Sequence, residues 1–308
     1  MDNRIIIIRN EVKKAIIGKD DIIDRALTAI LAGGHILIDD IPGVGKTTMA
    51  LAFSKAMGLK FKRVQFTPDV LPSDITGFTM YNKDTGKFSY VQGAAACNFL
   101  LADEINRTSS KTQSALLQIM QEGKVSVDGH TYKLPEPFIV MATQNPIGAV
   151  GTQMLPEAQL DRFMIQISMG YPDAEAQLQI LKDRSTADPL DQVRPVISAQ
   201  DIEQMKQQAK VTYVDDKIYM YITDLAEATR KHDLIKLGLS PRGAIALANM
   251  SKADAFAKGM NFVTPENVQA VFKDVCSHRI ILQPKAQLTE TTSEKVLAEI
   301  LESVKAPK

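Results

Sequence analysis

The residues with the clearest chemical meaning form a short segment near the start of the chain, which reads Pro42-Gly43-Val44-Gly45-Lys46-Thr47-Thr48. An apolar run, residues 36–38, precedes it, and a helical pattern follows. Glycines let a loop turn its backbone N–H groups toward an anion, and the following helix adds the positive end of its dipole. Lys46 would then reach the β- and γ-phosphates of a nucleotide, and the Thr47 hydroxyl would bind Mg²⁺. The alternative is a chance Gly-Lys-Thr in a turn.

Two adjacent carboxylates, Asp103 and Glu104, follow directly after the apolar run 98–102. Charges at the tip of a buried strand are costly unless they have a partner or a task. Beside a phosphate loop, Asp103 would hold Mg²⁺ through a water, and Glu104 would polarise the water that attacks the γ-phosphate. A solvated loop start is the weaker alternative, because a hydrolytic site needs its acids at this position.

Two further polar residues lie next to later apolar runs. Asn145 follows the run 138–142, and its amide could orient the same attacking water, although Asn-Pro is also an ordinary turn. Arg162 directly precedes the run 164–167. This arginine could pair with Asp161 in its own core, or it could project to the phosphate of a neighbouring subunit as an arginine finger.

A parallel β-sheet would bring these residues together. Between residues 35 and 170, short apolar runs alternate with helical patterns, and runs without polar alternation are typical of strands buried on both faces. We expect an α/β core with a parallel sheet of about five strands. Ligands of open sheets of this kind bind beyond the carboxyl ends of the strands, where most of the polar residues above lie. The predicted strands are residues 36–38, 61–66, 98–102, 138–142 and 164–167.

Two segments inside this core read as inserted β-hairpins. In the first, residues 78–81 and 87–91 favour strands and flank a turn-forming segment, residues 82–86. In the second, residues 124–127 and 130–134 flank Asp128-Gly129, and Asp-Gly between strand-forming runs is a strong hairpin signal.

The remaining chain reads as helical. Residues 1–34 show helical spacing with a break at Gly18, and after residue 172 the strand signal fades. We therefore expect an α/β core with N-terminal helices over residues 1–172 and an all-α second domain over residues 173–308. The expected N-caps are Asp20, Asp173, Ser198 and Thr264, with Pro265 in a first helical position. The helices predicted in the second domain are residues 173–184, 198–209, 215–231, 241–258, 264–274 and 292–304.

The composition is that of an ordinary globular protein. The chain has 308 residues, 45% of them hydrophobic, and its 36 basic residues balance its 36 acidic residues. This balance argues against bulk attraction to nucleic acid or anionic membranes, and the apolar runs are too short to span a bilayer. The two cysteines, Cys97 and Cys276, lie far apart and outside any metal-ligand spacing. We expect them to be buried free thiols, which suits a cytoplasmic protein.

In several segments the chain resembles the AAA+ ATPases, and within them the MoxR family. This resemblance implies a P-loop NTPase fold, with a five-stranded core, the two hairpins as pore-side inserts, and a helical lid. It covers residues 10–285. Besides the phosphate loop, the matching segments are Leu100-Leu101-Ala102-Asp103-Glu104-Ile105-Asn106-Arg107, Gln113-Ser114-Ala115-Leu116-Leu117-Gln118, Ala142-Thr143-Gln144-Asn145-Pro146, Leu155-Pro156-Glu157-Ala158-Gln159-Leu160-Asp161-Arg162-Phe163 and Gly238-Leu239-Ser240-Pro241-Arg242.

The resemblance also implies roles for individual residues. Lys46 and Thr47 match Walker A, and Asp103 and Glu104 match Walker B. Asn145 matches sensor 1, Arg162 the arginine finger, and Arg242 sensor 2, which contacts nucleotide. Ile17 and Gly18 match the loop that lies against adenine, and Arg107 could face a neighbouring subunit.

Three residues depart from the family pattern. Asp40 stands where the phosphate loop usually carries Gly. A carboxylate that pointed into the loop would repel nucleotide, so we expect Asp40 to point away. Lys19 stands where Gln is common, which leaves the adenine contacts open, and Gly148 stands where relatives often carry Glu.

The function implied by the resemblance is Mg²⁺-dependent ATP hydrolysis by a homo-oligomeric, hexameric ring that remodels, activates or matures a partner protein. Such partners often contain von Willebrand factor A domains. A nucleic-acid motor is the alternative, because helicase relatives share both hairpins; their lysines, such as Lys83 and Lys124, are accompanied by Asp84 and Asp128. A second alternative is a chelatase-type subunit for metal insertion, for which the sequence offers no metal-ligand cluster.

Overall fold

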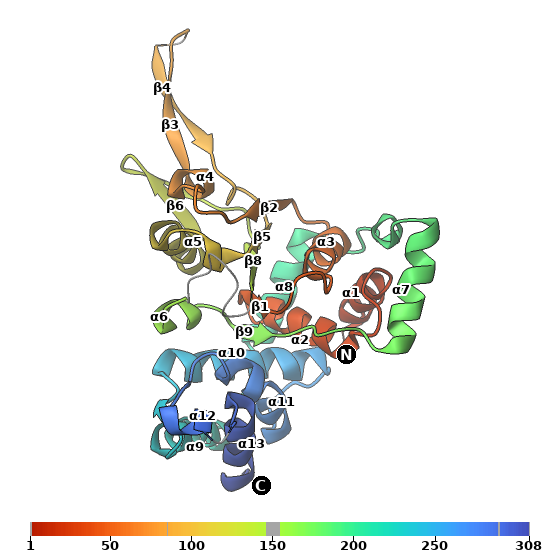
Figure 1. The fold of residues 1–308 in the computed structure, drawn as a ribbon, viewed down its shortest axis with the longest axis vertical. Coiled ribbons are helices and arrows are strands. Elements are labelled where there is room, and N and C mark those ends of the chain that lie inside the picture. The colour runs from red at the N-terminus through yellow and green to blue at the C-terminus, as the bar shows by residue number, and fades with distance from the viewer. Residues whose placement is uncertain (1, 85, 146–154, 289, 308) are drawn as a thin grey trace.

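The structure is a computed structural model of the chain, and it describes residues 2–84, 86–145, 155–288 and 290–307. Gly148 lies outside the described residues, as does the proline that follows Asn145. Figure 1 shows an α/β body with a long hairpin arm at one end and a helical bundle at the other.

A five-stranded sheet with the order β2-β5-β8-β1-β9 forms the centre of the body, and all of its pairings are parallel. The five predicted strands are therefore confirmed. Strand β2 lies at one edge and β9 at the other, whereas the phosphate loop follows the interior strand β1. The strands are β1 (Ile36–Asp39), β2 (Phe61–Gln65), β5 (Phe99–Asp103), β8 (Ile139–Gln144) and β9 (Ile165–Ile167).

Alternate side chains of the interior strands enter two separate hydrophobic clusters, one on each face of the sheet. On β5, for example, Leu101 packs in the larger cluster and Leu100 in the smaller one, and both are fully buried. Burying one such side chain stabilises the fold by about 1.5–3 kcal/mol. Both faces are thus covered, which explains why these strands read as continuous apolar runs.

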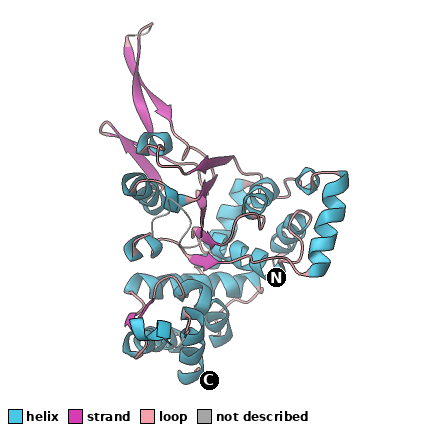
Figure 2. Cartoon of the chain, viewed as in Figure 1, coloured by secondary structure: helices cyan, strands magenta, loops and turns pink. Residues whose placement is uncertain are grey.

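Helices cover both faces of the sheet, as Figure 2 shows for the cyan elements around the magenta strands. The helices of this region are α1 (Asn3–Lys13), α2 (Asp20–Leu31), α3 (Lys46–Ala56), α4 (Pro72–Thr76), α5 (Ser110–Glu122) and the short α6 (Glu157–Leu160), with the 3₁₀ turn η1 (Ile105–Arg107).

Both predicted hairpins are confirmed. Strands β3 (Gly77–Asn82) and β4 (Lys87–Gln92) form the arm at the top of Figure 1, and β6 (Lys124–Val127) pairs with β7 (His130–Lys133) beside its base. The rings of Tyr90 and Tyr132 stack with centroids 4.0 Å apart. This contact joins one hairpin to the other.

The segment after residue 172 is helical, with one addition. Strands β10 (Ile235–Leu237) and β11 (Ile281–Leu282) form a small antiparallel pair within it. These strands are too short to give a periodic signal in the sequence. The helices are α7 (Ala174–Thr186), α8 (Ala199–Lys210), α9 (Asp216–Lys231), α10 (Pro241–Ala257), α11 (Pro265–Cys276), α12 (Pro284–Leu288) and α13 (Ser293–Ser303), with the 3₁₀ turn η2 (Pro189–Gln192).

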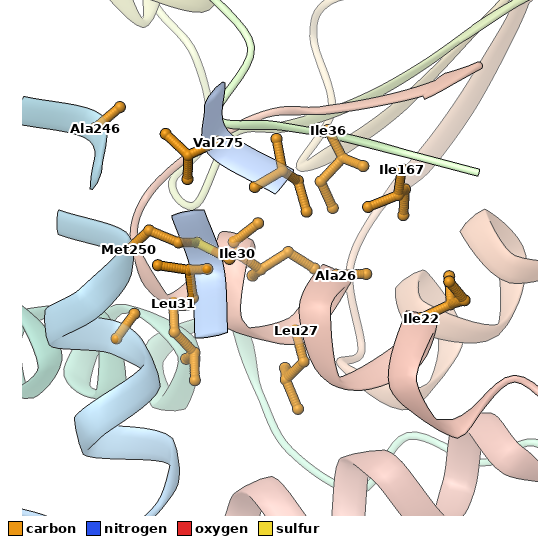
Figure 3. Packing of buried hydrophobic residues seen from close by; sticks show 14 of the residues in the cluster. Ile22, Ala26, Leu27, Ile30, Leu31, Ile36, Ile167, Ala246, Met250 and Val275 are labelled. Carbon is orange, nitrogen blue, oxygen red and sulfur yellow. The ribbon is translucent and has the colours of Figure 1, made fainter. Parts of the chain in front are cut away.

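Helix α2 connects the sheet to this helical part. In Figure 3, Ile30 and Leu31 of α2 lie beside Met250 of α10 and Val275 of α11. All four belong to one continuous buried cluster. This packing holds α10 and α11 below the sheet in the view of Figure 1. Among the described residues, no helix is both long enough and apolar enough to cross a membrane.

Most of the helix starts predicted from the sequence are confirmed. Asp173, Ser198 and Thr264 are N-caps, and Pro265 is the first helical residue of α11. The prediction for Asp20 is wrong, because Asp20 is already helical and its carboxylate binds Lys13 Nζ at 2.6 Å. Its charge still favours the first turn through the helix dipole.

Candidate active site

A cleft of about 650 Å³ opens at the carboxyl ends of the central strands. This volume lies within the range of about 300–1,000 Å³ that is usual for ligand sites. The residues predicted from the sequence that line it are Ile17, Lys19, Pro42, Gly43, Val44, Gly45, Lys46, Thr47, Thr48, Asp103, Glu104 and Asn145. The strand-tip residues are thus brought together as the parallel topology requires.

The phosphate loop has the backbone that anion binding requires. Gly43 and Gly45 have φ angles of 87° and 101°, a region that favours glycine. Helix α3 begins at Lys46, and no side chain caps its first turn, so its N–H groups remain available to a ligand. Burial lowers the pKa of Lys46 despite the nearby carboxylates, and its Nζ donates to the Asp40 carbonyl at 2.6 Å.

The Asp40 side chain points away from the loop, as expected. Its Oδ2 accepts hydrogen bonds from the backbone N–H groups of Met169 and Gly170 and from the Ser168 hydroxyl, and its Oδ1 accepts one from Ile41 N–H. Asp40 therefore ties the phosphate loop to the segment after β9. The usual glycine could not make this connection.

Replacing Asp40 by Gly is expected to lower the free energy of unfolding by about 2–4 kcal/mol, because buried N–H groups lose their acceptor. Urea denaturation measures the change. The Asp40→Asn variant retains an acceptor oxygen and should lose less. A Gly variant as stable as the parent would show that the carboxylate does not hold the two segments together.

The two carboxylates at the tip of β5 have different surroundings. Asp103 is buried, and its Oδ1 accepts a hydrogen bond from the Thr143 hydroxyl at 2.6 Å. The Thr143 oxygen in turn accepts from Glu104 N–H at 2.8 Å. Glu104 itself has a φ angle of 56°, so the chain turns sharply after Asp103 and the two side chains separate.

The Glu104 carboxylate is held by the chain's own polar groups. Asn145 Nδ2 donates to Oε1 at 2.9 Å, and Arg107 Nη1 donates to Oε2 at 2.7 Å. Burial raises the pKa of Glu104, but hydrogen bonds from Arg107, Asn145 and Gln65 outweigh it and leave the pKa below its usual value. Glu104 is therefore ionised at neutral pH and fixed in orientation. The Asn145 amide thus contacts Glu104 directly, and the residue that would complete an Asn-Pro turn lies outside the described residues.

The cleft contains residues that the sequence did not single out. Arg63 and Gln65 enter it from the edge strand β2, and one face of α7 contributes Gln177, Ile180 and Arg184. The spacing of the α7 residues is helical, but only the folded chain shows that this helix covers the cleft. Arg184 Nη2 lies 3.4 Å from Thr48 Oγ1.

The loop before α2 also lines the cleft. Ile17 lines the cleft, and Lys19 Nζ donates to the Tyr171 carbonyl at 2.8 Å. Gly18 has a φ angle of 70°, and a Cβ at this position would lie 2.7 Å from the Cβ of Ala176. Gly18 therefore permits the close approach of α7 rather than lining the cleft itself.

The donor set fits a hydrated magnesium ion. Asp103 and Thr47 both line the cleft and offer the oxygen ligands that Mg²⁺ prefers. Among the described residues, no group of three or more His, Cys, Asp or Glu side chains could hold a metal ion. A nucleotide-bound Mg²⁺ does not require one, since it uses one or two protein ligands, waters and phosphates.

Arg162 and Arg242 lie elsewhere. Both line a smaller pocket of about 230 Å³ formed by the segments that precede β1 and β9 and by α10. This pocket lies at the amino ends of strands β1 and β9, whereas the cleft lies at the carboxyl ends of the central strands. The length of strand β1 alone, roughly 13 Å, separates the two. Arg242 is therefore not part of the cleft of its own chain.

The pairing of Arg162 with Asp161 is not formed among the described residues. Asp161 instead accepts hydrogen bonds from Arg279 Nε at 2.8 Å and from the Ser240 hydroxyl at 3.1 Å. The Nε of Arg162 is buried and has no hydrogen-bond partner. The Arg162 guanidinium group is thus not part of the ion pair between Asp161 and Arg279, which joins the core to the helical part.

Comparison with known proteins identifies the family. Residues 35–165 match the model of the ATPase family associated with various cellular activities (AAA), and residues 227–300 match the AAA lid domain. The chain is 38% identical over 306 residues to Chaperone MoxR1 of Mycobacterium tuberculosis, covering 96% of this chain and 81% of that protein. The chain belongs to the MoxR family of AAA+ ATPases.

Further relatives of this MoxR-family chain span nearly its whole length. The uncharacterized protein YeaC of Bacillus subtilis is 45% identical over 296 residues, which cover 96% of this chain and 92% of YeaC. A crystal structure from Cytophaga hutchinsonii, presented as that of a candidate ATPase, is 38% identical with a TM-score of 0.92 and covers 99% of this chain and 96% of that one. The similarity to both proteins thus extends over the AAA and lid segments of this chain.

Proposed function

We propose that this protein hydrolyses ATP in a Mg²⁺-dependent reaction, as a hexameric ring, and uses the energy to remodel or mature a client protein. The observation that carries the proposal is the Glu104 carboxylate, which is ionised and fixed by Asn145 in the same cleft as Lys46. A fixed base beside a phosphate loop is the arrangement that water attack on a γ-phosphate requires.

The polar residues at the strand tips and in the phosphate loop divide this chemistry between them. Glu104 polarises the attacking water, and Asn145 orients Glu104. Lys46 offsets negative charge on the β- and γ-phosphates as it develops. Mg²⁺, when bound, neutralises charge on the same phosphates, and the Thr47 hydroxyl and Asp103 would hold it, the latter through a water. The α7 face and the Ile17 segment enclose the remainder of the nucleotide.

The site of one chain would be completed by a second copy. Arg162 and Arg242 are grouped in one pocket outside the cleft of their own chain. A guanidinium group supplied by a neighbour stabilises transition-state charge in many nucleotide hydrolases. A head-to-tail interface that brings the pocket of one copy to the cleft of the next produces a closed ring when the rotation between neighbouring copies closes. Hydrolysis would then depend on assembly, and Arg107 could face the same interface.

The client is proposed to be a protein, by analogy with the relative named Chaperone MoxR1. A von Willebrand factor A domain is the partner class that the family resemblance favours. We also propose that the chain divides between residues 172 and 173, and that it works in the cytoplasm, where its two buried thiols would stay reduced. Burial raises the pKa of Cys97 to about 11 and that of Cys276 to about 12, so neither is reactive.

Affinity capture with the Glu104→Gln variant tests the proposal. With ATP and Mg²⁺, this variant is expected to retain client proteins that the parent releases after hydrolysis. The Lys46→Ala variant is the matched control, because it keeps the ionised Glu104 but loses the phosphate contact. Equal capture by both variants would contradict an ATP-driven client cycle. Strong retention of DNA in place of protein, with DNA-stimulated hydrolysis, would favour the nucleic-acid motor instead.

A further inference from the structure

The edge strand β2 places one cation against the catalytic carboxylates. Arg63 Nη2 lies 2.6 Å from Asp103 Oδ2, and its Nε lies 3.2 Å from the same oxygen. The same Nη2 also donates to Gln65 Oε1 at 3.1 Å. Hydrogen bonds of this kind, in which both partners are charged, are stronger than those between neutral groups.

The pairing of β2 with β5 brings this arginine to the site. The strands are parallel neighbours, with Gln65 opposite Asp103 and Arg63 two residues earlier on the same face of its strand. The Arg63 side chain keeps 48% of its surface exposed, whereas that of Asp103 keeps only 11%. The acid is therefore fixed in the protein, and the arginine has room to move into the cleft.

The two oxygens of Asp103 are not equivalent. Oδ1 is bound by the Thr143 hydroxyl, which also accepts from Glu104 N–H, so it is part of the framework that shapes the turn. Among the described residues, Arg63 alone donates to Oδ2. Oδ2 is thus the oxygen with which Asp103 can bind a hydrated cation, and in the structure Arg63 occupies it.

We propose that Arg63 is the counter-ion of the metal-binding carboxylate, and that hydrated Mg²⁺ must compete with its guanidinium for Asp103 Oδ2. Arg63 would thereby set the Mg²⁺ concentration at which the cleft binds ATP tightly. It is a positioning residue, because it acts through Asp103. The inference rests on the proposed function, in which Asp103 holds Mg²⁺.

The test measures nucleotide binding instead of turnover. In the full chain carrying Glu104→Gln, binding of a fluorescent ATP analogue is titrated with Mg²⁺ and the half-saturating concentration is recorded. Adding Arg63→Met is expected to lower this concentration by about threefold or more, the range that a partly exposed ion pair supports. Arg63→Lys, which retains a charge without the two-nitrogen contact, should fall between the parent and the Met variant.

Arg184→Met is the matched control, since Arg184 is an exposed arginine that lines the same cleft but lies against Thr48 rather than Asp103. Its half-saturating Mg²⁺ concentration should stay close to that of the parent, although its ATP affinity can fall. If Arg63→Met behaves like Arg184→Met, or needs more Mg²⁺ than the parent, the inference is overturned.

A second readout uses no nucleotide. Mg²⁺ alone should raise the melting temperature of the Arg63→Met variant more than that of the parent, and Asp103→Asn introduced into the same variant should remove the difference. If ATP binding by the parent does not depend on Mg²⁺, the proposed function fails and this inference with it. If binding depends on Mg²⁺ but neither readout responds to Arg63, only the inference fails.

Discussion

Replacing Glu104 by Gln is expected to reduce ATP turnover by about 10²–10⁴-fold, the size of effect that a positioned general base supplies. ATP binding should persist, because the change leaves Lys46 and the glycine loop intact. The Gln side chain can still accept the hydrogen bond that Asn145 now donates to Glu104 at 2.9 Å, whereas its NH₂ group replaces the oxygen that Arg107 now contacts. What is lost is the negative charge that draws a proton from the attacking water.

Steady-state phosphate release and equilibrium binding of a fluorescent ATP analogue separate these two effects. Glu122→Gln is a suitable control, since it removes one negative charge from the exposed end of α5, outside the cleft. Unchanged turnover in Glu104→Gln would remove Glu104 from its role. Loss of binding together with turnover would instead mean that the carboxylate supports the cleft structurally.

The sheet was predictable because its central strands are buried on both faces. Leu100 and Leu101 point to opposite sides of β5, and each enters its own hydrophobic cluster. An interior parallel strand must therefore be apolar at every position, and such runs are easily recognised. Since the carboxyl ends of parallel strands share one edge of the sheet, Asp103 and Asn145 could be assigned to one site from sequence alone.

Contacts that depend on strand order or helix packing were not predictable. The contact of Arg63 with Asp103 requires β2 to lie next to β5, and no pattern within residues 61–66 shows that strand order. Likewise, no local pattern shows that the Arg184 face of α7 covers the cleft. Arg242 illustrates the same limit, because only the packing of α10 places it at the amino ends of the strands, away from Lys46.

Mixing two inactive variants is expected to restore hydrolysis if Arg162 acts on a neighbouring subunit. Arg162→Ala alone should lower turnover by about 10³-fold or more, the usual contribution of an arginine finger. Lys46→Ala alone should abolish productive phosphate binding. In a mixed ring, an Arg162→Ala chain provides an intact cleft and a Lys46→Ala neighbour provides an intact Arg162. Random equal mixing leaves roughly a quarter of head-to-tail interfaces complete.

The position of Arg162 in the structure gives the physical reason for this expectation. The arginine precedes β9 at the amino edge of the sheet, and the cleft opens at the carboxyl edge, so rotation of the side chain alone cannot bring it to its own cleft. Its Nε is buried without a partner, and the neighbouring Asp161 is committed to Arg279. Arg162 is thus not paired with Asp161, which leaves its guanidinium group available to a nucleotide bound in the cleft of a second copy.

Arg184 provides a control that distinguishes an arginine acting in its own cleft from one acting in the cleft of a neighbour. It lines the cleft of its own chain, so an Arg184→Ala chain and a Lys46→Ala chain are both defective in their own clefts, and mixing them should restore nothing. Phosphate release from each mixture is compared with that of its separate components, under conditions in which size measurements show rings. Absence of rescue for the Arg162 pair in assembled rings, or equal rescue for the Arg184 pair, would rule out a finger supplied by the neighbour.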